Sequence, residues 1–156
     1  MSNVKIRNNQ IHSVKIILYR RTNTGYEYLL IKEPEGIYGF VGGAEDEIDL
    51  TIEETAKREL FEEVGLSFKS VDLKKTEFTH TFIHSDQTSP RFGKTGILHV
   101  YIGKYNEKEK IKLEPELKEY VWKEEEEVKN ALKTSYKYLP SIFKKATELL
   151  KKSRPV

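Results

Sequence analysis

A short acidic helix, bounded by strong start and stop signals, is the feature that most constrains this chain. Thr51 is a good N-cap residue, and Glu54 follows it at the spacing of a capping box. Gly65 is typical of the position just beyond a helix C-terminus, where the backbone turns left-handed. The sequence therefore predicts a helix that begins near Thr51 and ends at Gly65.

Three carboxylates share one face of this helix. Glu59, Glu62 and Glu63 occupy positions i, i+3 and i+4, which fall within about a third of the helix circumference. The opposite side carries apolar residues that we expect to anchor the helix to a sheet: Leu60, Phe61 and Val64. The pattern predicts a helix that is held by one face while its carboxylates project from the other.

A divalent cation would relieve the repulsion among these carboxylates. Neighbouring negative charges raise one another's pKa, and oxygen ligands suit Mg²⁺ or Mn²⁺. Mg²⁺ often binds substrate phosphates as well as carboxylates, so the cluster indicates phosphate chemistry. The alternative is an ordinary solvated face balanced by Lys57 and Arg58. The run Glu124–Glu127 offers similar spacing without flanking glycines, and we interpret it as surface.

β-Branched and aromatic residues predict strands on both sides of the acidic helix. The expected strands are Ile11–Arg20, Tyr26–Ile31, Val71–Ile83, Ile97–Tyr105 and Tyr120–Trp122. The first two would form a hairpin, and Glu33–Gly43 reads as a loop with at most a short strand at Tyr38–Val41. Further helices are expected at Glu124–Leu132 and Tyr136–Lys151. We predict an α/β fold in which helices sandwich a mixed central sheet, forming one domain over residues 1–156.

Composition narrows the class of protein. With 27 basic and 25 acidic residues, the net charge of +2 gives no global attraction to DNA or to a membrane surface. The chain has no cysteine, which excludes disulfides, thiolate metal sites and a cysteine nucleophile. No apolar run approaches the ~20 residues needed to cross a bilayer, and the first residues lack the apolar stretch of a signal peptide. We therefore expect a cytoplasmic protein with no membrane or DNA partner.

The segment Arg58-Glu59-Leu60-Phe61-Glu62-Glu63-Val64-Gly65-Leu66 resembles the core of a known signature. It is similar to the Nudix motif of MutT-like hydrolases, Arg-Glu-aliphatic-x-Glu-Glu-x-Gly-aliphatic, with every specified position filled. The order of the expected strands and helices also fits the α/β/α sandwich of that family. The resemblance implies a pyrophosphohydrolase that uses Mg²⁺, or Mn²⁺, to cleave a diphosphate linkage in a nucleoside diphosphate derivative.

The resemblance also implies roles for individual residues. Glu59, Glu62 and Glu63 would hold the metal together with the carbonyl of Gly43, which follows Gly42 in the loop before the helix. Arg58 would orient the carboxylates of the motif.

The loop before the helix departs from the family pattern. The pattern places a Glu six residues after the glycine and eight before the Arg, whereas Asp49 is six after Gly43 but nine before Arg58. The position eight before Arg58 is Leu50, which cannot pair with an arginine. We expect Asp49 or Glu47 to fill the role.

The residue that activates water lies elsewhere in the chain. Some members of the family use a glutamate from a later loop, ahead of a tryptophan. Glu116, six residues before Trp122, is the first choice here and Glu119 the second. The segment Glu107–Glu127 is dense in charge, so a solvated loop is the alternative for either residue.

Several residues are candidates for contact with the substrate. Tyr38 and Phe40 could stack on a base, although packing beneath the loop is the competing role for each. Arg91 and Lys94, in the polar loop His84–Lys94, are cations suited to phosphate. A shared metal site at His80 and His84 is rejected, because a strand would separate them by about 13 Å.

The sequence does not choose among the substrates of the family, which include oxidised nucleoside triphosphates, nucleotide sugars, dinucleoside polyphosphates, coenzymes and capped RNA. It also leaves open whether the chain is a monomer or a homodimer. The main alternative is a non-catalytic sensor on the same fold that binds a nucleotide, although the intact acidic motif argues against it. An isoprenoid diphosphate isomerase would need the missing cysteine, and an acidic-helix interaction module is the remaining alternative.

Overall fold

A mixed β-sheet forms the centre of the computed structural model, which describes residues 3–152. The ends of the predicted domain, residues 1–2 and 153–156, lie outside the described residues. The strands are β1 (Gln10–Thr22), β2 (Gly25–Lys32), β3 (Tyr38–Gly39), β4 (Val41–Ala44), β5 (Val71–Ile83), β6 (Thr95–Tyr105) and β7 (Glu119–Glu124). The helices are α1 (Ile52–Val64), α2 (Glu125–Leu132) and α3 (Leu139–Lys152).

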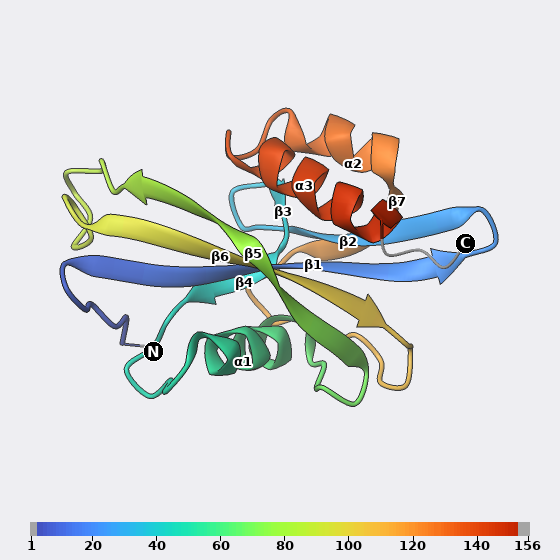
Figure 1. Cartoon of the computed structure of the whole chain (residues 1–156), viewed down its shortest axis with the longest axis horizontal. Helices are drawn as coiled ribbons and strands as arrows, with labels where there is room; N and C mark the ends of the chain where they lie inside the picture. The colour runs from blue at the N-terminus through green and yellow to red at the C-terminus, as the bar shows by residue number, and fades with distance from the viewer. Residues whose placement is uncertain (1–2, 153–156) are drawn as a thin grey trace.

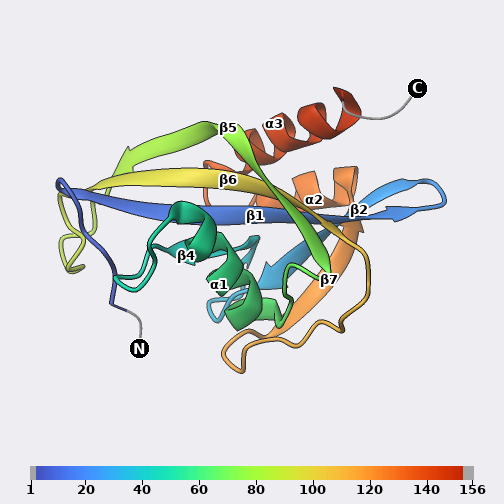
Figure 2. The same cartoon turned by 60° about the horizontal axis from the view of Figure 1, so that its bottom comes forward.

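The strands pair in the order β3-β2-β1-β6-β5, with β4 also paired to β1 and β7 to β2. The β1–β6 pair is parallel, while every other pairing is antiparallel, so the predicted mixed sheet is confirmed. Helix α1 covers one face, and α2 and α3 cover the other (Figures 1 and 2). This arrangement is the expected α/β/α sandwich.

The sheet divides at the point where β1 and β2 stop pairing. The hairpin register ends with Tyr19 opposite Tyr28, and β4 then takes up the same edge of β1 opposite Ser13–Ile16. The chain leaves β2 through β3 and joins β1 through β4. The prediction of one short strand at Tyr38–Val41 was therefore wrong. Two strands with different partners stand there, and the glycine pair belongs to the second strand rather than to a loop.

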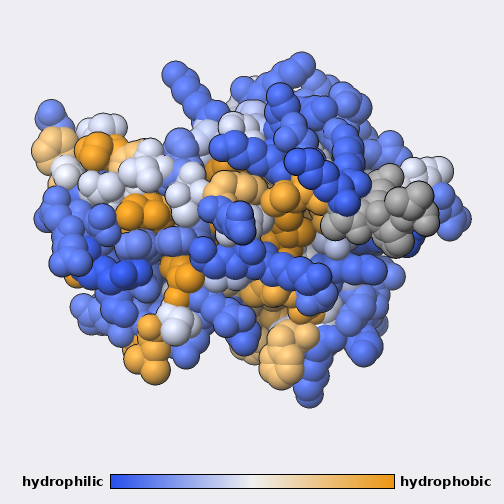
Figure 3. All heavy atoms as spheres, viewed as in Figure 1, coloured by the Kyte–Doolittle hydropathy of each residue, from blue (hydrophilic) through white to orange (hydrophobic). Residues whose placement is uncertain are grey.

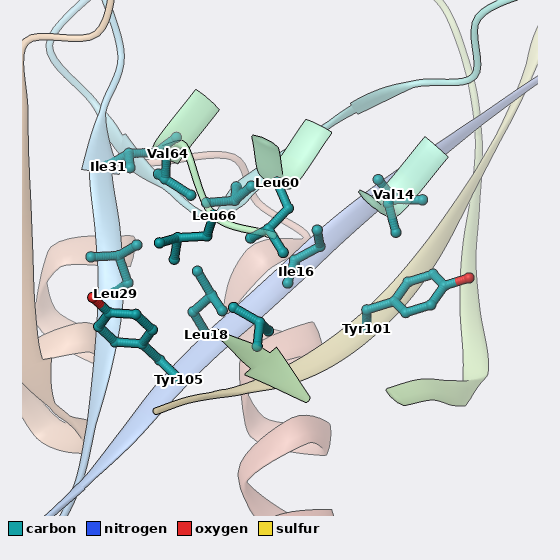
Figure 4. Close-up of a cluster of buried hydrophobic side chains, with 13 residues drawn as sticks. Val14, Ile16, Leu18, Leu29, Ile31, Leu60, Val64, Leu66, Tyr101 and Tyr105 are labelled. Atoms are coloured by element: carbon teal, nitrogen blue, oxygen red, sulfur yellow. The ribbon is translucent and has the colours of Figure 1, made fainter. Parts of the chain in front are cut away.

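Two apolar clusters hold the layers together. The first lies between the sheet and α1 and includes Leu18, Leu29, Leu60 and Val64 (Figure 4). The second lies between the sheet and the pair α2 and α3, and its buried aromatic residues are Tyr28, Phe40 and Phe143. Each cluster buries one face of the sheet, so the burial of apolar area stabilises both sides of the sandwich.

Helix α1 has the predicted ends. Thr51 Oγ1 accepts a hydrogen bond from the backbone N–H of Glu54 at 3.2 Å, and Gly65 adopts a left-handed φ of 70°. Its buried stripe is Ala56, Leu60 and Val64, which recur every four residues along one side. The expectation that Phe61 anchors the helix was wrong, because that side chain lies about 100° around the axis from Leu60 and is 64% exposed.

The outer faces of the sandwich are polar. Figure 3 shows a mainly hydrophilic surface broken by small apolar patches. Three glutamates of the run predicted to be surface pair with lysines: Lys129 lies 3.2 Å from Glu125 and from Glu126, and Lys123 lies 3.5 Å from Glu127. Within residues 3–152, no helix is both long and apolar enough to cross a membrane.

A histidine pair joins the two parallel strands. His12 of β1 and His99 of β6 stack with ring centroids 5.1 Å apart, and His12 Nδ1 lies 2.8 Å from His99 Nε2. Burial lowers the pKa of His99 to about 4, and the charges of His12, Lys75 and Arg7 act in the same direction against Glu45. The His99 Nδ1 atom is buried and has no hydrogen-bond partner among residues 3–152.

This pair makes the fold sensitive to acid. Between the ordinary pKa of 6.5 and about 4, the unfolded chain binds a proton at His99 that the folded chain does not. Stability present above pH 6.5 is therefore lost as the pH falls towards 4, by roughly 1–2 kcal/mol after a discount for partial solvent access. We expect His99→Gln to flatten this part of the stability curve measured by urea unfolding at several pH values. Parallel curves for the variant and the native chain would contradict the assignment.

Candidate active site

The glycine pair of β4 brings its backbone against two carboxylates of α1. The N–H of Gly42 donates a 2.7 Å hydrogen bond to Glu63 Oε1. A Cβ built on Gly43 would lie 2.4 Å from Glu59 Cδ, so no side chain fits between the strand and that carboxylate. Two of the three predicted metal ligands are thus packed against the strand, rather than projecting freely from the helix.

Burial disfavours the charged form of both Glu59 and Glu63. It raises the pKa of Glu59 to about 7 even though Arg58 opposes the shift, and it raises the pKa of Glu63 to about 8 against the Gly42 hydrogen bond. Each is raised further by neighbouring carboxylates, among them Glu114. The site therefore holds more negative charge than its own residues compensate.

Arg58 ties the helix to the loop before it. Its Nε and Nη2 donate to Asp49 at 3.0 and 2.9 Å, and Nη2 also donates to the carbonyl of Ala44 at 3.0 Å. Nη1 reaches Glu59 at 2.9 Å and Glu62 at 3.1 Å. The acidic partner left open between Asp49 and Glu47 is therefore Asp49, in spite of the extra residue in the loop.

Asp49 is itself held by several donors. Burial alone would raise its pKa, but hydrogen bonds from Arg58, the Asp46 N–H and Thr55 Oγ1 lower it below the usual value. Arg58 accordingly has its pKa raised, chiefly by the hydrogen bond to Asp49. The pair is a charged clasp that fixes the direction in which Arg58 presents its remaining N–H groups.

The donor set at this centre fits a hard divalent cation. Glu59 and Glu63 are half-buried oxygen donors with excess negative charge, whereas Glu62 is half-exposed beside Arg58. Over the described part of the chain, no three His, Asp or Glu side chains are arranged to hold a metal ion together. The carboxylate pair would therefore rely on other oxygen ligands, such as the Gly43 carbonyl, water and phosphate, as Mg²⁺ sites commonly do.

A carboxylate that sequence reasoning missed lies beside this centre. The backbone N–H of Glu114 donates to the Glu63 carbonyl at 2.9 Å, and its half-buried carboxyl raises the pKa of both Glu59 and Glu63. Burial, Glu116 and Glu62 raise the pKa of Glu114 in turn. Glu116, the first choice for the water-activating residue, is exposed next to it.

Glu119, the second choice, lies in β7 and contacts other residues. It accepts a hydrogen bond from Tyr38 Oη at 3.0 Å and pairs with Lys32 Nζ at 3.5 Å. Only proximity in space distinguishes Glu114 from these two residues, because all three belong to one charged segment of the sequence.

The four residues predicted to contact the substrate occupy different environments in the structure. Phe40 is buried against Phe143, so the stacking role considered for it was wrong and the competing packing role is confirmed. Tyr38 is half-buried and engaged with Glu119. Arg91 and Gly43 line one cavity of about 350 Å³, whereas Lys94 is not among its lining residues.

The fold and the site together define an α/β protein in which an acidic helix faces a glycine pair, with an arginine-carboxylate clasp beside them. A family model described as NUDIX domain matches residues 11–142. The chain belongs to the NUDIX domain family.

Solved structures support the same fold. A C. elegans Ap4A hydrolase in a binary complex aligns with a TM-score of 0.74 at 19% identity, over 91% of this chain and 98% of that one. The E. coli dihydroneopterin triphosphate pyrophosphohydrolase gives a TM-score of 0.72 at 14% identity, over 93% and 97%. The NUDIX domain of Shewanella oneidensis NrtR, complexed with ADP ribose, gives 0.71 at 17%, over 90% and 88%. No curated protein matched by sequence.

The clasp predicts a specific stability difference. Asp49→Ala leaves the 14% exposed Arg58 side chain without its main partner, and we expect a loss of about 3 kcal/mol in the free energy of unfolding. Glu47→Ala changes an exposed residue of the same loop and is expected to cost less than about 0.5 kcal/mol. Urea unfolding measures both variants. Equal losses, or a larger loss for Glu47→Ala, would contradict the pairing.

Proposed function

We propose that this chain is a Mg²⁺-dependent pyrophosphohydrolase that cleaves a diphosphate linkage in a nucleoside diphosphate derivative; Mn²⁺ is a suitable substitute. The observation that carries the proposal is the pair Glu59 and Glu63, both packed against the backbone of Gly42–Gly43 with their pKa values raised by burial. Membership of the NUDIX domain family supports the same reaction class.

The residues at the centre have distinct parts in this reaction. Glu59, Glu63 and the Gly43 carbonyl would hold the cation, with Glu62 as a more exposed carboxylate of the same helix face, and the bound cation would supply electrostatic stabilisation to phosphate oxygens. Arg58 acts as a positioning residue, because its Nη1 bonds to Glu59 and Glu62 fix the directions of those carboxylates. The Gly42 N–H fixes one oxygen of Glu63 in the same way.

Cleavage transfers a phosphoryl group to water. The water oxygen forms a bond to phosphorus while the bond from phosphorus to the bridging oxygen breaks. The electron pair of that bond leaves with the departing phosphate, and a carboxylate accepts the proton of the water. Glu114 suits this last step better than Glu116 or Glu119, because it is half-buried and electrostatically coupled to Glu59 and Glu63.

The first test is product release from a panel of nucleoside diphosphate derivatives in Mg²⁺, with Glu63→Gln beside the native chain. We expect Glu63→Gln to lower kcat/KM at least about 100-fold, since it removes a charged oxygen donor from the cation site. Its Tm in a chelator should equal or exceed that of the native chain, because burial disfavours the charged form of Glu63. Glu126→Gln, an exposed glutamate of α2, is the matched control.

The outcomes separate catalysis from binding alone. Native turnover that disappears in a chelator and in Glu63→Gln supports the hydrolase. An unchanged rate in Glu63→Gln would overturn the assignment of the metal face. If the native chain releases no product from any compound of the panel but still binds nucleotide, the non-catalytic sensor is favoured instead.

A second test compares the three candidate proton acceptors. We expect Glu114→Gln to lower kcat about 100-fold and to remove the acidic limb of the pH–rate profile, which is the signature of a lost general base. Glu116→Gln and Glu119→Gln are expected to change kcat less than about threefold. A loss confined to either of these two would move the role to that residue.

A further inference from the structure

The connection between β6 and β7, residues 106–118, crosses the C-terminal end of α1 (Figure 2), and we call it the strap. The Lys112 N–H donates a 2.9 Å hydrogen bond to the Val64 carbonyl. The Glu114 N–H donates to the Glu63 carbonyl, also at 2.9 Å. The last carbonyls of a helix have no partner within the helix, so the strap satisfies two of them. The same bonds fix the point at which the Glu114 side chain leaves the strap.

Close packing defines the register of the strap on α1. A Cβ built on Gly65 would lie 3.1 Å from the Cβ of Lys112, so the strap runs directly against the end of the helix. The two neighbours of Lys112 pack against the apolar cluster between the sheet and α1. A shift of one residue would bring Pro115 opposite the Glu63 carbonyl, and proline has no N–H to donate. The position of Glu114 therefore depends on this register.

Glu109 anchors the strap on the side of β6. Its Oε1 accepts hydrogen bonds from the Ser67 N–H at 2.9 Å, from Ser67 Oγ at 2.9 Å and from Ser70 Oγ at 2.7 Å. These bonds, the one from Ser70 first, lower the pKa of Glu109 below its usual value. Tyr105 Oη donates to the Glu109 carbonyl as well. Because both serines lie just beyond α1, Glu109 ties the strap to the chain that continues from the helix.

We propose that Glu109 is a positioning residue for the reaction. Through Ser67 and Ser70 it sets the register of the strap on α1, and the strap in turn holds the Glu114 carboxyl beside Glu63. The inference rests on the proposed function, in which Glu114 accepts the proton of the attacking water. Glu109 acts through the backbone of the strap and needs no contact with the substrate.

The first arm of the test measures the strap itself, by amide hydrogen exchange without nucleotide. In Glu109→Ala, the Lys112 and Glu114 amides should exchange about tenfold faster, because the strap leaves the helix end more often. Glu109→Gln keeps the shape and an acceptor oxygen; it should give about a threefold increase and replaces Glu109→Ala if that variant does not fold. Glu107→Gln, an exposed strap glutamate that pairs with Arg20 at 3.5 Å, is the matched control. Unchanged exchange at both amides in the folded Glu109 variants would overturn the anchor.

The second arm measures turnover of the panel compound that the native chain cleaves fastest. Glu109→Ala should lower kcat about tenfold and change KM less than twofold, because the displaced group acts in proton transfer rather than in binding. In a Glu114→Gln background the same substitution should have no further effect on kcat, since no proton acceptor is left to position. A general loss of structure would instead lower kcat by the same factor in both backgrounds. Equal factors, or a raised KM with kcat unchanged, would overturn the positioning role.

Failure of this inference differs from failure of the proposed function. Native cleavage in Mg²⁺ with kcat unchanged in the Glu109 variants would overturn the positioning role and leave the hydrolase intact. Cleavage with kcat unchanged in Glu114→Gln would overturn the role of Glu114 and that of Glu109 together, again without touching the hydrolase. If no compound is cleaved, the proposed function fails and takes the role in catalysis with it, whereas faster exchange in Glu109→Ala would still support the anchor of the strap.

Discussion

The close approach of α1 to the backbone of β4 is the constraint on which the rest of this structure depends. A helix and a strand usually meet through their side chains, which keep the two backbones well apart. Here the glycine pair removes the strand's side chains, so that the carboxylates of Glu59 and Glu63 contact the strand itself. The apolar stripe of Ala56, Leu60 and Val64 supplies the burial that holds the helix in this position.

This packing sets up an electrostatic conflict that the fold only partly resolves. Two acidic groups are placed where burial raises the pKa of each, and a single Arg58 serves Glu59, Glu62 and Asp49 together. Asp49 takes most of the compensation, because its pKa is lowered while those of Glu59 and Glu63 stay raised. Arg58 thus fixes the geometry through Asp49, and the carboxylate pair keeps an excess of negative charge that a cation can balance.

The sequence predicted what depends on local chemistry and failed where distant segments decide. The caps at Thr51 and Gly65 and the limits of β5 follow from neighbouring residues, and all were found. Phe61 was misplaced because three apolar residues within five positions of a helix do not all share one face. The division into β3 and β4 depends on which strand each segment pairs with, and no local signal carries that choice.

The residues of the candidate site were likewise predictable only where the local sequence determines them. The order of residues identified the acidic face, and it narrowed the partner of Arg58 to two acids that only the fold could separate. The sequence could not distinguish Glu114 from the other acids of its charged segment. Glu114 differs from them because it contacts Glu63, a residue far from it in the sequence. For Lys15, the sequence predicted only a position within the strand Ile11–Arg20.

Alternation along β1 explains how the two sides of the sheet come to share one centre. Val14 belongs to the cluster beneath α1, and alternation directs the side chain of Lys15, the next residue, to the other face; atoms of both residues line the cavity. A sheet normally separates groups on its two faces, but Gly42 lies opposite Lys15 and carries no side chain. Even a methyl group there would meet the Val14 carbonyl oxygen at 2.1 Å. The glycine leaves a thin place in the sheet across which Lys15 and Glu63 interact electrostatically. The two glycines therefore have different parts: Gly43 lets the helix approach, because a Cβ there would meet Glu59, and Gly42 keeps β4 close to Val14 and Lys15 of β1.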